Sequence, residues 1–308
     1  MASKNIYRTL YIGLYVFIAV ALLFLVARSS YTEGFEPVPV AMFPICFLCV
    51  KPPEEFLDNL LKMTYTQPIY IVCDSNEYEP PEQIKSKDYT PVILTEASTD
   101  VNHGISPNTL YFIKIDEAEC GKRGYINSAS TIPKKPSAWD KALYFFCLKN
   151  MSRHIWFIEE DVFIPRLTIL DEINVRNLNT DLVTKQHVSE KDDPGFFWWF
   201  DAEDKMERPY YRSLVCAVRV SRRILGKIAI IAKEKRTVCF VETLFSTIAH
   251  QSKFTIEKAP ELQSIIFRHS WTKDTVHMNG LFHPIKDILE HTQYRAFLSQ
   301  RVHNSKSA

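Results

Sequence analysis

A long uncharged stretch near the N-terminus sets the first constraint on this chain. Residues 9–27 read TLYIGLYVFIAVALLFLVA and contain no charged side chain. About 19 residues at ~1.5 Å rise form a helix of about 28 Å, which matches a bilayer core of ~30 Å. A cleaved signal peptide has a shorter apolar core and small residues at its cleavage site, which this stretch lacks. The stretch therefore predicts an uncleaved membrane anchor.

The charges that flank this stretch predict its orientation. Lys4 and Arg8 precede it, whereas Arg28, Glu33 and Glu36 follow it. Because basic residues favour the cytoplasmic side, residues 1–8 are expected to form a short cytoplasmic tail. The rest of the chain is then expected on the far side of the membrane, as in a single-pass type II protein.

Composition constrains the chain beyond the anchor. The 308 residues are 46% hydrophobic and 24% charged, which excludes disordered and collagen-like classes and allows a sizeable core. Residues 28–42 contain prolines and little periodicity, which predicts a stem, and residues 43–308 are left as one domain. The net charge of +1 gives no reason to expect a nucleic-acid partner. With only 8 glycines and no G-x-G pair, the chain lacks glycine-rich phosphate loops.

Short apolar runs alternate with amphipathic stretches along the domain. Buried strands are expected at residues 44–50, 69–73, 92–94, 111–115, 155–158 and 214–220. Helices are expected from residues 52, 137, 221 and 238, and Pro284 is expected to open a last helix with His283 in its N-cap region. Ser137 and Asp140 form a variant capping box. The alternation predicts an α/β fold with a mainly parallel central sheet flanked by helices.

Seven cysteines lie mostly inside these apolar runs, which favours buried thiols. Cys46 and Cys49 have the spacing of a redox or zinc motif. In a strand, however, residues three apart point to opposite faces of the sheet, and no second pair completes a zinc site.

Three adjacent carboxylates, Glu159, Glu160 and Asp161, end the strand expected at residues 155–158, and another apolar run follows them. Burying three charges without compensation is costly. A divalent cation that prefers oxygen ligands, such as Mn²⁺ or Mg²⁺, would offset that cost. The carboxyl end of a central strand is also where open α/β sheets bind ligands. The alternative is a solvated turn without an ion.

The succession of elements resembles a known class of enzymes. A strand, a helix, a strand that ends at Asp74, a helix, and a strand that ends in a D-x-D-like triplet resemble the Rossmann-like GT-A fold of nucleotide-sugar glycosyltransferases. The resemblance covers about residues 43–291, and Glu159 stands where the first Asp of the motif is usual. The anchor and stem resemble those of Golgi members, which implies a catalytic domain in the Golgi or ER lumen.

The resemblance implies an activity and roles for particular residues. The enzyme would move a sugar from a nucleotide-diphosphate sugar to a glycan, glycoprotein or lipid acceptor. Asp161 and a late histidine, for which His283 is the candidate, would bind Mn²⁺ or Mg²⁺. Glu159 would contact the ribose or the metal, and Asp74 and Glu160 would contact the donor. The cation would neutralise the leaving nucleoside diphosphate.

Two further charged groups have candidate roles in such a transfer. Lys141 and Arg219 are candidates to reach the diphosphate, although each taken alone is better explained as a solvated surface charge. An inverting reaction needs a base, and Glu242 stands alone in an apolar stretch where burial would raise its pKa. The alternative bases lie on a more polar segment and are Asp201, Glu203 and Asp204.

Five aromatic residues in a row, FFWWF at residues 196–200, are unusual next to a glycine. Phe197, Trp198 and Trp199 are expected to stack on an acceptor sugar; the alternatives are a core segment or a membrane-proximal wedge.

Two other functions fit the same residues. A metal-dependent nucleotidyl- or phosphotransferase would use the carboxylates to bind a triphosphate. A non-catalytic membrane-anchored protein would retain the fold for binding alone, because fold does not fix function.

Overall fold

The computed structural model describes the chain over residues 43–85, 88–98, 103–129, 135–166 and 168–307. The chain divides into two units, Met1–Ala41 and Met42–Ala308, and the described residues belong to the second. None of the helices in the described ranges has the length and apolarity that a membrane crossing needs. The expected anchor at residues 9–27, the tail and the stem all lie outside these ranges.

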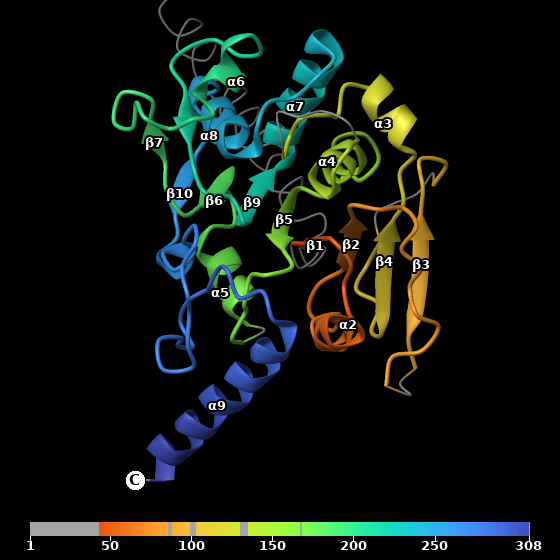
Figure 1. Ribbon diagram of the computed structural model, residues 1–308, viewed down its shortest axis with the longest axis vertical. Coiled ribbons are helices and arrows are strands. Elements are labelled where there is room, and N and C mark those ends of the chain that lie inside the picture. Colours follow the sequence, from red (N-terminus) through yellow and green to blue (C-terminus); the bar gives the residue numbers. More distant parts are fainter. Residues whose placement is uncertain (1–42, 86–87, 99–102, 130–134, 167, 308) are drawn as a thin grey trace, which may run out of the picture. The chain divides into compact units, whose positions relative to one another are not determined.

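An eight-stranded sheet forms the centre of this unit (Figure 1) in the order β10-β6-β9-β5-β1-β2-β4-β3. Its strands are β1 (Ile45–Cys49), β2 (Ile69–Cys73), β3 (Thr90–Leu94), β4 (Thr109–Ile113), β5 (His154–Glu159), β6 (Leu182–Thr184), β9 (Ala217–Ser221) and β10 (Ile256–Lys258). Within this sheet only β9 runs antiparallel to its neighbours, β5 and β6. A separate antiparallel pair consists of β7 (Val188–Ser189) and β8 (Tyr211–Arg212). The mainly parallel α/β sheet expected from the sequence is confirmed, and it is compatible with a Rossmann-like arrangement.

Helices cover both faces of the sheet. They are α2 (Glu54–Leu61), α3 (Glu117–Lys122), α4 (Ala138–Leu148), α5 (Ile169–Arg176), α6 (Trp199–Glu203), α7 (Arg222–Lys235), α8 (Val241–Gln251) and α9 (Ile288–Ser307), with a 3₁₀ turn, η1, at Pro260–Leu262. One core packs α4, α7 and α8 on the face that carries Cys46, and the other packs α2 and α5 on the face that carries Cys49. The opposite orientations expected for these two cysteines are therefore confirmed. All seven cysteines are free thiols, and only Cys147 is not buried.

Local signals explain where several helices begin. The Ser137 side chain accepts a hydrogen bond from the Asp140 N–H, and the Asp140 carboxylate accepts one from the Ser137 N–H, which confirms the capping box of α4. Ser221 caps α7 through the Ile224 N–H. The expectation for Pro284 was wrong, because the last helix begins at Ile288. The segment before this helix instead forms two isolated β-bridges with other parts of the same chain. Phe282 pairs with Phe163, and His283 pairs with Ile265.

The strand order brings the carboxyl ends of several strands to one place. β1 lies between β2, which follows it in the chain, and β5, which follows only after β3, β4 and α4. The connections therefore leave β1 in opposite directions, and a crevice is expected at the carboxyl ends of β1 and β5. Because β9 runs antiparallel to β5, the start of β9 and the residue before it, Cys216, also lie at this edge.

Candidate active site

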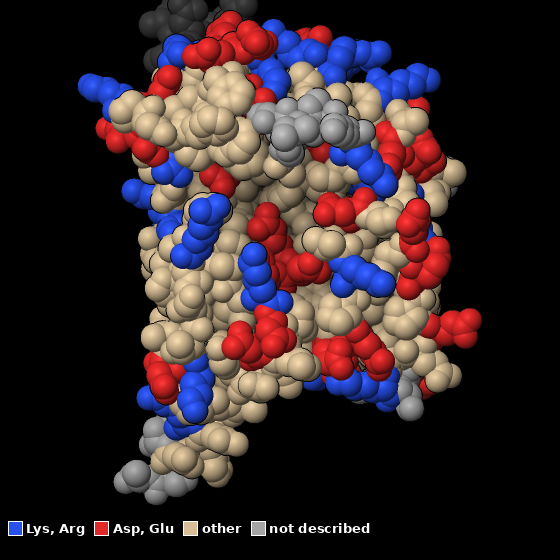
Figure 2. All heavy atoms as spheres, viewed as in Figure 1, with Lys and Arg blue, Asp and Glu red and all other residues tan. Residues whose placement is uncertain are grey.

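A cavity of about 810 Å³ opens at the carboxyl ends of β1, β2 and β5. Its lining includes the carboxylates of Asp74, Glu159, Glu160, Asp161 and Asp287. Figure 2 shows a hollow near the middle of the viewed face with acidic side chains at its floor. A crevice of this kind is the usual ligand site of an open α/β sheet.

Glu159, Asp161 and His283 converge at the end of β5. The Nε2 atom of His283 lies 3.4 Å from an Asp161 oxygen and 3.8 Å from a Glu159 oxygen. Backbone hydrogen bonds hold the two segments together, since the Ile285 N–H donates to the Asp161 carbonyl over 2.8 Å. The structure thus brings together the three residues for which the sequence suggested metal binding, although the helix start that favoured His283 is absent.

The imidazole of His283 is fixed by its second nitrogen. Its Nδ1 lies 3.0 Å from the Ile266 carbonyl, and this places the ring proton on Nδ1 and leaves Nε2 to face the carboxylates. Burial alone would lower the pKa of His283, but the hydrogen bond to Asp161 and the charges of Asp161 and Glu159 raise it above its ordinary value. Without a cation, the carboxylates therefore attract a proton to this imidazole.

The other acids at this edge are held by backbone or ring N–H groups. Glu159 accepts a hydrogen bond from the Trp139 indole over 3.0 Å, and Asp74 accepts one from a backbone N–H at the start of α4 over 2.8 Å. Glu160 accepts one from the Val50 N–H over 3.0 Å. Burial, with the charges of Asp161 and Asp74, nevertheless raises the pKa of Glu160. Each of these acids is oriented while part of it faces the cavity.

Glu242 lies on the first turn of α8, close enough to interact electrostatically with Glu159 and His283. Its backbone carbonyl accepts a hydrogen bond from Ser213, in the segment that leads to β9. Burial raises the pKa of Glu242 to about 7 and the charge of Glu159 adds to this rise, whereas Arg212 and His283 oppose it. A carboxyl group with this pKa can accept or donate a proton near neutral pH.

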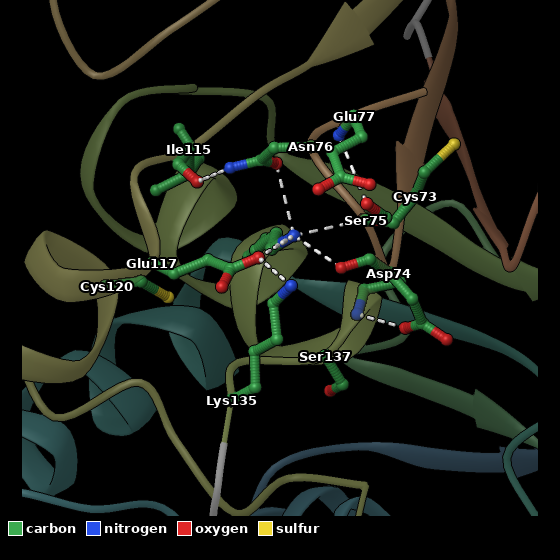
Figure 3. A network of polar contacts seen from close by, with 12 residues as sticks. Cys73, Asp74, Ser75, Asn76, Glu77, Ile115, Glu117, Cys120, Lys135 and Ser137 are labelled. Carbon is green, nitrogen blue, oxygen red and sulfur yellow. Dashed lines mark hydrogen bonds and ion pairs between the residues drawn. The ribbon is translucent and has the colours of Figure 1, made fainter. Parts of the chain in front are cut away.

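Lys141 does not reach the cavity, which corrects its expected contact with a diphosphate. Its side chain is fully buried, and its ammonium contacts the Asp74 carbonyl at 2.7 Å, the Asn76 side chain at 3.1 Å and Glu117 at 3.3 Å. Figure 3 shows these partners gathered around one nitrogen, with Lys135 beside Glu117. The role of Lys141 is to tie the end of β2 to α3 and α4.

Arg219 is also corrected, because it lies in the middle of β9 and does not line the cavity. It pairs with Trp156, near the middle of β5, and its side chain is fully buried. The guanidinium donates to the Asn174 side chain over 2.8 Å and to the Asn177 carbonyl. Arg219 therefore fastens β9 to α5 and the loop that follows it.

The aromatic run divides between core and surface. Trp199 is only 5% exposed and donates its indole N–H to the Asp193 carbonyl over 2.7 Å, so its expected contact with an acceptor is corrected. Phe197 is 71% exposed, and Trp198 packs against Phe240, whose ring lies 5.0 Å away, two residues before Glu242. Only Phe197 and Trp198 of the expected platform are available, together with Phe200, which is 49% exposed.

The alternative bases are engaged elsewhere. Asp201 is buried, accepts a hydrogen bond from the Phe240 N–H over 2.7 Å and pairs with Lys205. Glu203 is exposed and pairs with Arg208 at 2.8 Å. Asp204 is exposed at the end of α6. None of the three lines the cavity, and neither does Glu242, which differs from them in its electrostatic interaction with Glu159 and His283.

Sequence reasoning missed three contributors to this site. Lys51 and Lys286 line the cavity, and neither forms an ion pair with another residue in the described ranges. Lys286 lies only three residues after His283 in the sequence, and this proximity to a candidate metal ligand could have indicated that Lys286 belongs to the site. The third contributor is Cys216, whose sulfur lies within 4.8 Å of ligand atoms of Glu159 and His283. An apolar run around a cysteine gives no such signal, since the contact depends on the pairing of β9 with β5.

Comparisons of the sequence with protein-family models and with curated proteins give no match.

Proposed function

We propose that this chain is a metal-dependent glycosyltransferase with a GT-A-like domain, which transfers a sugar from a nucleotide-diphosphate sugar to a glycan, glycoprotein or lipid acceptor. One observation carries the proposal. Glu159 and Asp161 line a cavity at the carboxyl ends of the central strands, and His283, which is distant from them in sequence, lies within 3.8 Å of both carboxylates. A cluster with a purely structural role would not be expected to border an open cavity, whereas this one borders a cavity of about 810 Å³.

The donor set fits a divalent cation, and it fits Mn²⁺ better than Mg²⁺. Two carboxylates supply oxygen atoms, which suit either ion. His283 adds a nitrogen atom that is oriented by the Ile266 carbonyl, and Mg²⁺ rarely takes such a ligand. When bound, the cation neutralises charge on the leaving diphosphate.

The donor would lie along the carboxyl ends of β1 and β2. Asp74, at the end of β2, has a free oxygen lone pair for a ribose or base, and Glu160 lies beside it at the end of β5. Lys51 and Lys286 face the same cavity and take the role of phosphate-binding cations that the sequence had suggested for Lys141 and Arg219. No glycine-rich loop is required for this arrangement.

Glu242 is the base in the proposed transfer, which is then an inverting reaction. Its carboxylate takes the proton of the acceptor hydroxyl, and the acceptor oxygen forms a bond to the anomeric carbon of the donor. The bond from that carbon to the diphosphate oxygen breaks, and the nucleoside diphosphate leaves with the electron pair. A carboxyl group whose pKa is about 7 is well matched to this proton transfer at neutral pH.

The acceptor would approach over the N-terminal end of α8. Phe240, next to α8, packs against Trp198, and Phe197 and Phe200 are exposed beside it. Aromatic faces of this kind offer apolar contact area to one side of a sugar ring.

The membrane position belongs to the proposal as well. Residues 9–27 would anchor the protein with its catalytic domain in the Golgi or ER lumen. In sealed microsomes the domain is expected to be protected from added protease. Digestion of the domain without detergent would show that it faces the cytoplasm and would contradict the proposed orientation.

The test of the activity uses purified full-length protein with Mn²⁺ and a panel of nucleotide-diphosphate sugars, measuring the nucleoside diphosphate released. Wild type is expected to turn over one of these donors, Asp161→Asn to lose that turnover, and the surface variant Asp204→Asn to keep it. Consumption of a nucleoside triphosphate instead would identify a nucleotidyl- or phosphotransferase. Absence of binding to either kind of nucleotide would leave a non-catalytic role.

A further inference from the structure

The centre at the end of β5 contains a sulfur atom that the proposed transfer does not use. Cys216 immediately precedes β9, and its side chain is 6% exposed. Its Sγ, an imidazole nitrogen of His283 and a carboxylate oxygen of Glu159 all lie within 4.8 Å of one another. Cys216 belongs to the apolar core on the face that carries Cys49, and within the described residues its proximity to Glu159 and His283 distinguishes it from the other buried cysteines.

Each of the three ligand groups is held in place by contacts outside the set. The Ile266 carbonyl fixes His283, so that Nε2 faces Glu159 at 3.8 Å. The Trp139 indole holds one oxygen of Glu159 and leaves the other toward His283. The Cys216 carbonyl accepts the Glu159 N–H over 2.8 Å, which fixes the two residues side by side. Such supporting bonds orient metal ligands and strengthen their binding.

We propose that Glu159, Cys216 and His283 form a Zn²⁺ site, with the fourth position open to Asp161 or to water. A tetrahedral zinc centre with one sulfur, one nitrogen and one oxygen ligand places these atoms about 3.5 Å apart. Side-chain movements of about an ångström bring the observed separations to that value. On coordination the thiol proton passes to solvent and the sulfur binds as a thiolate.

The sulfur makes this site selective for a soft cation. Thiolate and imidazole ligands favour Zn²⁺, whereas Mn²⁺ depends on carboxylate oxygen atoms, and Zn²⁺ generally binds a given site more tightly than Mn²⁺. Zn²⁺ and Mn²⁺ would share Glu159 and His283, so only one of them can occupy the centre. Zinc would therefore inhibit the enzyme reversibly; this consequence, unlike zinc binding itself, rests on the proposed function.

The experiment uses the purified full-length chain, freed of metal with a chelator, and Cd²⁺ as a spectroscopic probe for zinc. Cadmium bound to a thiolate gives an ultraviolet charge-transfer band that no carboxylate or imidazole produces. We expect one equivalent of Cd²⁺ to produce this band and Zn²⁺ to abolish it by competition. In Cys216→Ala the band is lost and the affinity for Zn²⁺ falls about 100-fold.

Cys147→Ala is the matched control, because Cys147 is the most accessible cysteine and is not part of the candidate metal cluster within the described residues. This variant is expected to keep the band. Cys216→Ser is a second substitution of the proposed ligand, and thermal melting of both Cys216 variants shows whether loss of the band reflects unfolding. A band that persists in folded Cys216 variants, or no band in wild type, overturns the zinc site. A cadmium band without sugar transfer would reject the proposed function alone, whereas Mn²⁺-dependent transfer without the band would reject the zinc site alone.

Discussion

The ends of β2 and β5 lie at the same edge of the sheet and use charge in opposite ways. At β2, the buried ammonium of Lys141 is surrounded by oxygen atoms of Cys73, Asp74, Asn76 and Glu117. At β5, two carboxylates face one imidazole at 3.4 and 3.8 Å across a cavity mouth.

The two strand ends differ in how far protein groups satisfy the charged side chains. The ammonium at the end of β2 has its hydrogen-bonding capacity filled by the protein, so it stabilises the fold and offers nothing to a ligand. At the end of β5 negative charge exceeds positive charge, and part of each carboxylate is accessible. Substitutions at the end of β2 are therefore expected to lower stability, and substitutions at the end of β5 are expected to lower ligand binding and activity.

The largest expected effect belongs to the β5 end. Asp161→Asn should lower sugar transfer roughly 1,000-fold, or about 4 kcal/mol in the barrier, because one charged metal ligand is removed. The free energy of unfolding should stay within about 0.5 kcal/mol of wild type, since Asp161 is partly exposed. Turnover assays and urea unfolding measure the two quantities. A large loss of stability would show that the acidic end is as structural as the end of β2.

The opposite result is expected for Lys141→Met at the β2 end. Removing a buried ammonium leaves the carbonyl groups of Cys73 and Asp74 and the side-chain oxygen of Asn76 without this donor, which should cost about 3 kcal/mol of unfolding free energy. Lys135→Met is the control, because Lys135 contacts the same Glu117 at 3.3 Å while 58% of its side chain is exposed. That variant should lose less than about 0.5 kcal/mol. Equal losses in the two variants would contradict the distinction.

Glu242→Gln tests whether Glu242, on α8, acts as the base together with the carboxylates at the end of β5. Transfer should fall about 100-fold, or about 2.7 kcal/mol. In wild type the rate should rise with pH through about 7, because the base acts only when it is deprotonated. The Gln variant should lose this rise. Rates measured from pH 5 to 9 provide the check, with Glu203→Gln as the surface control.

The same residue links the site to stability. Since the folded pKa of Glu242 is raised from 4.5 to about 7, its contribution to stability is present below pH 4.5 and is lost as pH rises through 7. Glu242→Gln should therefore be more stable relative to wild type at pH 8 than at pH 5. An unchanged difference between these two pH values would show that Glu242 is not desolvated.

Local signals made much of the fold predictable. Apolar runs identified β1, β2 and β5 because strands buried on both faces need continuous apolar sequence. Ser137 and Asp140 fixed the start of α4, since a capping box is a contact between near neighbours. The acidic triplet was found for a similar reason, because its position depends only on the strand that precedes it.

Long-range contacts were beyond such signals. Pro284 is typical of a helix start, but backbone bonds to the segment after β5 hold this stretch outside α9. Lys141 and Arg219 looked like surface cations because a sequence does not show which charges will be enclosed by distant carbonyl groups. Cys216 was missed because only the antiparallel pairing of β9 brings it to Glu159.

The smallest expected effect concerns Lys286, the accessible cation that takes the place expected for Lys141. Lys286→Ala should weaken nucleoside diphosphate binding about fivefold, or about 1 kcal/mol, because an exposed ammonium contributes a screened attraction. The difference from wild type should shrink at high salt, and unfolding should be unchanged. Calorimetric titration at two salt concentrations measures it, with the exposed Lys233→Ala on α7 as the control. If Lys286→Ala binds as tightly as wild type while Lys141→Met loses affinity without losing stability, then the saturated end of the edge would be the one that holds the phosphates, and the contrast between β2 and β5 would be reversed.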